Sequence, residues 1–139
     1  MKQLVVDAGP LISLFYAKDP QHTECIAGFE QLNIAKTLVL APVSIIFEVY
    51  KWLLQRANPY QAQQALEVMV TELYALPSNR EHLLELQTFA SRLPTWRGTL
   101  EDASVIVAAF QYRCPVWTTN YRDFSAFKAL EFWTPDQTF

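Results

Sequence analysis

Apolar residues follow two periods along the chain, and their alternation predicts short strands separated by longer helices. Short runs of branched apolar residues predict strands at residues 2–6, 38–41, 73–76, 116–118 and 131–133. Apolar residues returning every three or four positions predict helices at 11–16, 21–33, 43–58, 60–72, 80–93 and 99–112, and a short helical turn at 124–130. Such an alternation needs crossover connections, so we expect an α/β sandwich in which helices cover both faces of a mainly parallel sheet.

Composition supports one folded domain spanning residues 1–139, since 51% of the residues are hydrophobic and 18% are charged. The two cysteines, Cys25 and Cys114, have no short-range partner and are typical of a reduced, cytoplasmic protein. The formal charge of −3 predicts no broad basic surface, and no apolar run is long enough to cross a membrane.

Several kinds of chemistry are excluded by what the chain lacks. The three glycines lie far apart, which excludes a Walker loop and a dinucleotide-binding fingerprint. Two histidines and two cysteines in unrelated places make no closed zinc site, and no serine lies in a G-x-S-x-G motif. The remaining chemical groups are carboxylates, hydroxyls and amides.

Four acids lie where a parallel sheet of this kind places its functional cleft, outside the carboxyl ends of the strands. Asp7 and Asp123 follow the first and fourth predicted strands, and Glu48 flanks the apolar stripe of the helix at 43–58. Asp102 opens a helix that is apolar on nearly every side, where an acid needs a partner, a metal ion or a proton.

Each acid also has an ordinary structural explanation. Asp7 and Asp123 are well placed to cap the helices that follow them, and Glu48 can be a boundary residue with its head in water. Asp102 completes the capping box Thr99-Leu100-Glu101-Asp102. Taken together, however, four acids converging on one cleft would repel each other unless a cation lay among them, and oxygen ligands alone select Mg²⁺ or Mn²⁺.

The same residues resemble a known family. The motifs are Val5-Val6-Asp7, Glu48 in the helix after the second strand, Leu100-Glu101-Asp102-Ala103, and Thr118-Thr119-Asn120-Tyr121-Arg122-Asp123-Phe124. In their order and spacing the chain resembles PIN-domain ribonucleases, and in its length it is most similar to the VapC-type toxins of bacterial toxin–antitoxin pairs. One departure is Ala8-Gly9-Pro10 after Asp7, where the family often has a serine or threonine.

The resemblance implies a five-stranded parallel sheet and a Mg²⁺- or Mn²⁺-dependent endoribonuclease. By position, Asp7 and Asp102 match the acids that bind the metal most directly, Glu48 the helical acid and Asp123 the fourth acid. Asn120 falls on the Thr-x-Asn/Asp position, so either Asn120 or Asp123 can be the fourth site residue. The implied partners are an RNA substrate and an antitoxin protein. A second copy of the chain is expected from the aromatic content of 14%, since Tyr50, Trp52, Trp96 and Trp133 can form a dimer face or receive an antitoxin helix where they are not packed in the core.

Other residues are expected to support this chemistry. Thr119 and Asn120 can position water or phosphate oxygens at the strand end. Candidates for phosphate contacts are Lys51, Arg56, Arg97 and Arg122, and the alternative for each is an ordinary solvated surface charge.

Rival functions fit less well. A haloacid dehalogenase-type phosphatase needs a second aspartate at position 9, which is glycine, and a receiver domain needs paired acids by the first strand. The remaining alternative is a non-catalytic PIN-like module that binds RNA or regulates another protein.

Overall fold

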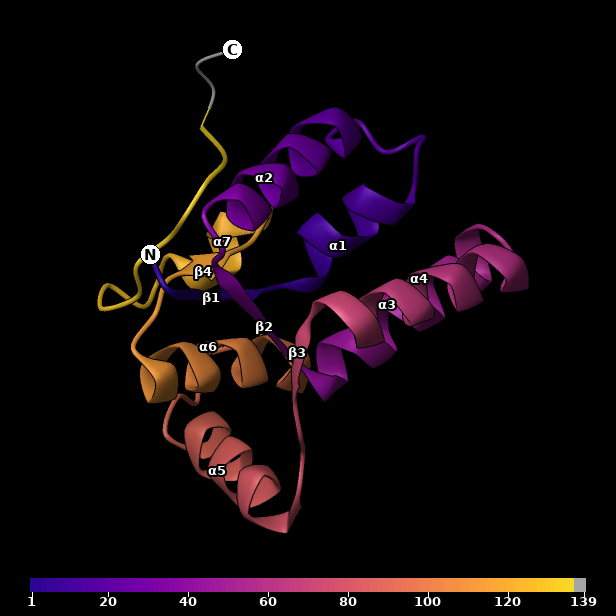
Figure 1. Cartoon of the computed structure of the whole chain (residues 1–139). Helices are drawn as coiled ribbons and strands as arrows, with labels where there is room; N and C mark the ends of the chain where they lie inside the picture. Colours follow the sequence, from indigo (N-terminus) through magenta and orange to yellow (C-terminus); the bar gives the residue numbers. More distant parts are fainter. Residues whose placement is uncertain (137–139) are drawn as a thin grey trace.

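The computed structural model describes residues 1–136 and shows an α/β arrangement in which helices separate every pair of successive strands (Figure 1). The strands are β1 (Gln3–Val6), β2 (Leu38–Pro42), β3 (Tyr74–Leu76) and β4 (Val116–Trp117). The helices are α1 (Ala8–Phe15), α2 (His22–Ile34), α3 (Val43–Arg56), α4 (Pro59–Glu72), α5 (Arg80–Ser91), α6 (Leu100–Tyr112) and α7 (Tyr121–Phe124).

The four strands form one parallel sheet in the order β3-β2-β1-β4. Strand β1 is central, and its residues Leu4, Val5 and Val6 are fully buried. Because β1 has a neighbour on each side, Val5 pairs with Leu40 of β2 and with Val116 of β4. The predicted parallel sheet is therefore confirmed, and the carboxyl ends of its strands meet at one edge.

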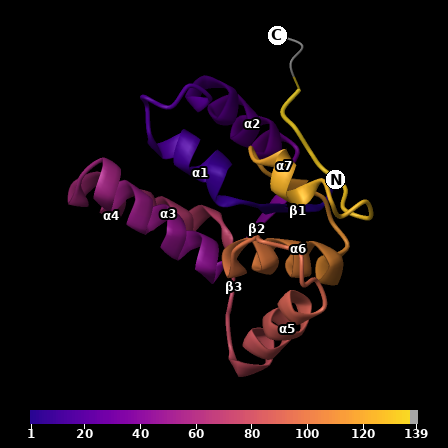
Figure 2. The same cartoon turned by 180° about the vertical axis from the view of Figure 1, so that it is seen from behind.

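Helices cover both faces of this sheet. Figures 1 and 2 show α2 and α7 on one side of the strands and α6 on the other, with α5 beyond α6. Helices α3 and α4 lie side by side next to the carboxyl end of β2. The connection from α6 to β4 reverses the chain, so the first turn of α6 lies near the carboxyl ends of the strands.

The prediction of five strands is wrong, because the sheet among residues 1–136 has four. The segment at 131–133 pairs with β4 only through an isolated bridge between Val116 and Phe132. Val116 N–H donates to Glu131 O, and Trp133 N–H donates to Val116 O, both at 2.9 Å. Strand β4 is only two residues long, and Val116 is the residue through which this segment pairs with it.

The chain after β4 also differs from the prediction of a helical turn at 124–130. Helix α7 begins earlier, at Tyr121, and ends at Phe124. Beyond it the chain makes single turns, with Phe127 N–H donating to Phe124 O and Leu130 N–H donating to Phe127 O. Asp123 is therefore inside a short helix, and the interpretation that it caps a following helix is wrong.

Helix α1 likewise begins earlier than predicted, at Ala8. Pro10 lies inside its first turn, where a missing N–H removes no helical hydrogen bond. This start places Asp7 directly between the central strand and a helix. No helix among residues 1–136 is long and apolar enough to span a bilayer.

Candidate functional site

Asp7 is the most buried of the predicted site acids, with 6% of its surface exposed. It occupies the N-cap position of α1, but its side chain makes no capping hydrogen bond. Instead its Oδ2 accepts a 2.8 Å hydrogen bond from Thr118 Oγ1. Burial raises the pKa of Asp7 to about 6, against the lowering effect of Thr118 and of the Ala8 backbone. The carboxylate is thus held at the edge of the sheet by the neighbouring strand.

Thr118 is a site residue that the sequence analysis missed. It directly follows β4, is 1% exposed, and also accepts a 2.9 Å hydrogen bond from the Asn120 backbone N–H. The Asn120 side chain in turn donates to Asp123 Oδ2 at 2.6 Å. Hydrogen bonds therefore connect Asp7 with Asp123 through the loop after β4. In the sequence, the signal that could have identified Thr118 was a threonine at the end of a buried strand, because a buried hydroxyl needs a hydrogen-bond partner.

Asp102 is held by the capping box that the sequence indicated. Asp102 N–H donates to Thr99 Oγ1 at 3.1 Å, and Thr99 N–H donates to Asp102 Oδ2 at 3.2 Å. Burial raises the pKa of Asp102 in spite of these two bonds, and the charges of Asp123 and Glu101 raise it further. The box keeps the Asp102 carboxylate in one place at the start of α6.

Glu48 lies in the second turn of α3 and is half-buried. Burial raises its pKa from 4.5 to about 7, and the nearby charges of Asp7, Glu101 and Asp102 add to the increase. Glu101 is the second residue that the sequence analysis missed. The sequence analysis placed it only within the capping box. Its position next to Asp102 was the signal that its charge would act on the same site.

The electrostatic couplings join five acids from four separate segments, which we call the acid cluster: Asp7, Glu48, Glu101, Asp102 and Asp123. All the charged neighbours that shift the pKa values of Asp7, Glu48 and Asp102 are acids. Like charges gathered in a partly buried place attract a cation, and carboxylate oxygens are suited to a hard divalent ion.

The acid cluster is nevertheless spread out. Within residues 1–136 no three His, Cys, Asp or Glu side chains lie close enough together to hold a metal ion as they stand. Mutual repulsion favours such separation of carboxylates, and side-chain rotation would be needed to bring three of them onto one ion. The donor chemistry thus fits Mg²⁺ or Mn²⁺, whereas the side-chain positions describe an open arrangement.

The Thr119 side chain lies directly against Gly9 in the first turn of α1. A Cβ at Gly9 would overlap Thr119 Oγ1 and would lie 3.2 Å from Thr119 Cβ. The threonine side chain therefore takes the space above the first turn of α1 that a serine or threonine at position 9 would fill. A hydroxyl lies beside this turn after all, but it comes from the loop after β4.

The basic residues suggested for phosphate contacts are all exposed: Lys51, Arg56, Arg97 and Arg122. Lys51 lies three residues after Glu48 on α3, Arg122 precedes Asp123 in α7, and Arg97 precedes the capping box of α6. Arg56 differs from the others because its guanidinium lies over the Trp52 ring, 5.8 Å from the centroid.

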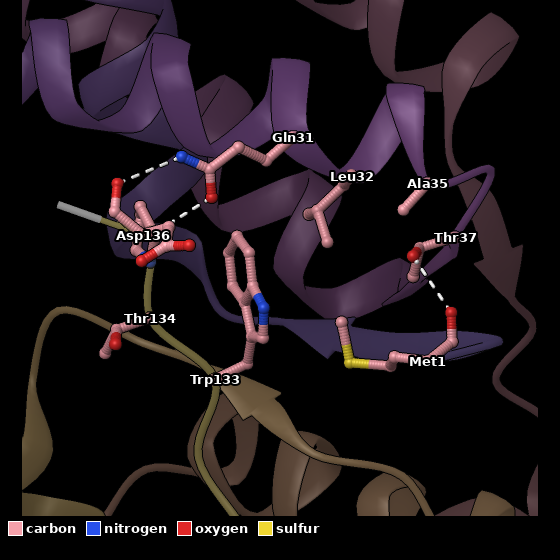
Figure 3. A pocket seen from close by; sticks show the side chains of 9 residues that line it. Met1, Gln31, Leu32, Ala35, Thr37, Trp133, Thr134 and Asp136 are labelled. Carbon is pink, nitrogen blue, oxygen red and sulfur yellow. Dashed lines mark hydrogen bonds between the residues drawn. The ribbon is translucent and has the colours of Figure 1, made fainter. Parts of the chain in front are cut away.

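A separate hollow of about 540 Å³ lies at the amino ends of β1 and β2, opposite the acid cluster (Figure 3). Trp133 lies in its wall, between Met1 on one side and the Gln31–Asp136 pair on the other. Gln31 Nε2 donates to Asp136 O at 3.1 Å, and Asp136 N–H donates to Gln31 Oε1 at 2.8 Å. These bonds fasten the segment after β4 to α2, which is a structural role.

Comparison with solved structures identifies the fold. A toxin from Mycobacterium tuberculosis, VapC20, described as cleaving the sarcin-ricin loop, superposes with a TM-score of 0.79 at 16% identity, covering 95% of this chain and 99% of that one. A chain of the Rickettsia felis VapBC2 complex, solved with a promoter DNA fragment, gives 0.72 at 13% identity, covering 96% and 99%.

A chain of the DNA-bound VapBC complex of Salmonella typhimurium gives a TM-score of 0.70 at 16% identity, covering 96% and 98%. No protein-family model matches the chain, and no curated protein matches its sequence. Fold and site thus define an α/β protein with acids gathered at the carboxyl edge of a parallel sheet. The fold is that of the VapC-type PIN-domain toxins, which confirms the resemblance predicted from the sequence at the level of the fold.

Proposed function

We propose that the protein is a Mg²⁺- or Mn²⁺-dependent endoribonuclease and the toxin of a type II toxin–antitoxin pair. One observation supports this most: acids from four distant segments lie at one edge of the sheet, and the charged groups that raise the pKa values of Asp7, Glu48 and Asp102 are all acids. The fold adds support, because it is shared with a toxin described as cleaving the sarcin-ricin loop.

The residues that would hold the metal are Asp7 and Asp102, with Glu48 and Asp123 as further ligands or as groups that orient water. Asp7 and Asp102 are the best prepared, because each carboxylate accepts a hydrogen bond from a threonine: Asp7 from Thr118 Oγ1, and Asp102 from the Thr99 backbone N–H. When bound, such an ion supplies Lewis-acid polarisation of a phosphodiester and a more acidic water.

The side chains of this protein have distinct roles in the proposal. Thr118 orients the Asp7 carboxylate, and the capping box orients that of Asp102. Glu48, with a pKa of about 7, can gain or release a proton at its carboxylate near neutral pH. The Asn120 amide donates to Asp123 Oδ2, which supports a proposal in which both residues, and not only one of them, belong to the site.

Binding of the polyanionic substrate needs positive charge near these acids. The exposed side chains of Lys51, Arg97 and Arg122 supply it from three elements that carry or precede acids of the cluster. An antitoxin protein is the proposed partner, because structures of the same fold are VapBC complexes of a toxin–antitoxin type. A homodimer is proposed as the state in which the toxin acts.

The test is RNA cleavage by the purified protein with Mn²⁺ and with EDTA, for the wild type and for the Asp7→Asn and Asp102→Asn variants. We expect metal-dependent cleavage that falls at least about 100-fold in either variant, corresponding to a loss of about 3 kcal/mol of transition-state stabilisation. Glu67→Gln, which changes an exposed acid of α4, is the matched control and should cleave normally.

Two outcomes contradict the proposal. Cleavage that survives both aspartate substitutions would assign the activity to another site or to a contaminant. Tight RNA binding without cleavage at any Mg²⁺ or Mn²⁺ concentration would favour a non-catalytic RNA-binding or regulatory module.

A further inference from the structure

Two serine hydroxyls connect α3 to α6 beside the acid cluster. Ser44 Oγ and Ser104 Oγ lie 2.8 Å apart, although 60 residues separate them in the chain. Ser104 is completely buried, and its Oγ donates a 2.6 Å hydrogen bond to Glu101 O. The two bonds form a continuous polar connection inside the contact between the helices.

The proton count decides the direction of this connection. A serine hydroxyl carries one proton, and that of Ser104 is given to the Glu101 carbonyl. Ser44 must therefore be the donor to Ser104. The connection runs from the first turn of α3 to the peptide carbonyl of Glu101, the residue before Asp102.

The placement of these serines matters because of the helix period. Ser44 lies four residues before Glu48, and Ser104 lies three residues after Glu101, so each serine shares a helix face with an acid of the cluster. The charges of Glu48, Glu101 and Asp102 repel each other across the same contact. That repulsion acts to separate the two helix ends that the serine pair joins.

We infer that Ser44 and Ser104 form a positioning clamp that holds Glu48 of α3 at a set separation from Glu101 and Asp102 of α6. Neither serine is expected to touch RNA or metal. The clamp acts through the helices, and its meaning for metal binding rests on the proposed function.

The first experiment measures Mn²⁺ affinity by titration calorimetry. Ser44→Ala should weaken binding about tenfold, at the lower end of the range found when groups that orient metal ligands are removed. Ser44→Thr keeps the hydroxyl and should bind Mn²⁺ nearly as the wild type does. Ser13→Ala is the matched control: Ser13 is also buried and donates a 2.9 Å bond, to Asp19, but it lies at the far end of α1.

Two results of this titration would overturn the clamp. Ser44→Ala could bind Mn²⁺ as tightly as the wild type, which would mean that the serine pair does not set the acids' separation. Alternatively, Ser13→Ala could weaken binding as much as Ser44→Ala, which would mean that any lost buried bond has the same effect.

The second experiment needs no metal and separates the clamp from the proposed function. Thermal melts in EDTA at pH 8 compare Glu48→Gln in the wild-type and Ser44→Ala backgrounds. Removing the charge should raise the midpoint in both, but by about 2 °C less in Ser44→Ala, because helices without the clamp have already moved apart and relieved the repulsion.

Equal increments in the two backgrounds would show that the serines do not act on this repulsion, and would overturn the clamp. A wild type that neither binds Mn²⁺ nor cleaves RNA would refute the proposed function instead. The metal-free comparison would then still decide whether the clamp exists.

Discussion

Asp7→Asn should make the metal-free protein more stable at neutral pH, although it removes a residue of the proposed site. The pKa of Asp7 rises from 3.8 to about 6 because the carboxylate is buried at the end of the central strand. Each pKa unit corresponds to about 1.4 kcal/mol, so the ionised group destabilises the folded state by about 3 kcal/mol. An uncharged amide of the same shape removes this penalty.

The gain should be smaller than the full penalty. The amide oxygen of the asparagine can still accept the hydrogen bond from Thr118. Its NH₂ group, however, brings two donors into a site where only 6% of the Asp7 surface is exposed. An unsatisfied buried donor costs about 1 kcal/mol or more. We therefore expect a net stabilisation of about 2 kcal/mol, or about 6 °C in the unfolding midpoint of a domain of this size.

The pH dependence follows from the raised pKa. Between pH 3.8 and about 6 the folded protein holds a proton on Asp7 that the unfolded chain has released. The folded state then binds more protons, so the free energy of unfolding falls as the pH rises through this window. The advantage of Asp7→Asn should be complete above about pH 6 and should disappear near pH 3.8.

The assay is differential scanning calorimetry in EDTA from pH 4 to pH 8, with Glu67→Gln as the surface control. A midpoint of Asp7→Asn at pH 8 that is equal to or below that of the wild type would refute the idea that burial and neighbouring charges make ionised Asp7 destabilising. A difference that stays constant over the whole pH range would also refute it. Addition of Mn²⁺ should reverse the order of stability, since only the wild type keeps the ligand.

Four further predictions concern the supports of the site. Thr118→Val should raise the pKa of Asp7 further, because the hydroxyl now lowers it, and NMR titration of the Asp7 carboxyl would show no change if the bond were unimportant. Thr99→Ala should destabilise the protein by about 1 kcal/mol and speed amide exchange in the first turn of α6, as expected for loss of an N-cap; unchanged exchange would contradict this. Gly9→Ala should destabilise by about 1 to 3 kcal/mol through overlap with Thr119, and the double variant with Thr119→Gly should recover most of that loss in the same melts. Mn²⁺ should raise the midpoint more at pH 8 than at pH 5, because protons compete with metal for carboxylates; an equal increase at both values would speak against these ligands.

Local patterns in the sequence were sufficient for most of the secondary structure. The two hydrophobic periods predicted all four strands and the order of the helices, since helix and strand spacing depend on neighbours within a few residues. They failed at 131–133 and 124–130, where short segments depend on contacts with β4. A segment with a strand-like sequence pattern forms a strand only if the neighbouring strand offers it residues to pair with.

For the site, the sequence by itself determined which acids were available, and it showed that Asp102 opens an apolar helix and that Glu48 flanks an apolar stripe. Only the tertiary structure decided that these acids are coupled, because parallel crossovers bring the ends of β1, β2 and β4 and the start of α6 to one edge of the sheet. It also added Thr118 and Glu101, and it joined Ser44 to Ser104. Contacts between such distant residues depend on how the strands are ordered in space, and no local pattern carries that information.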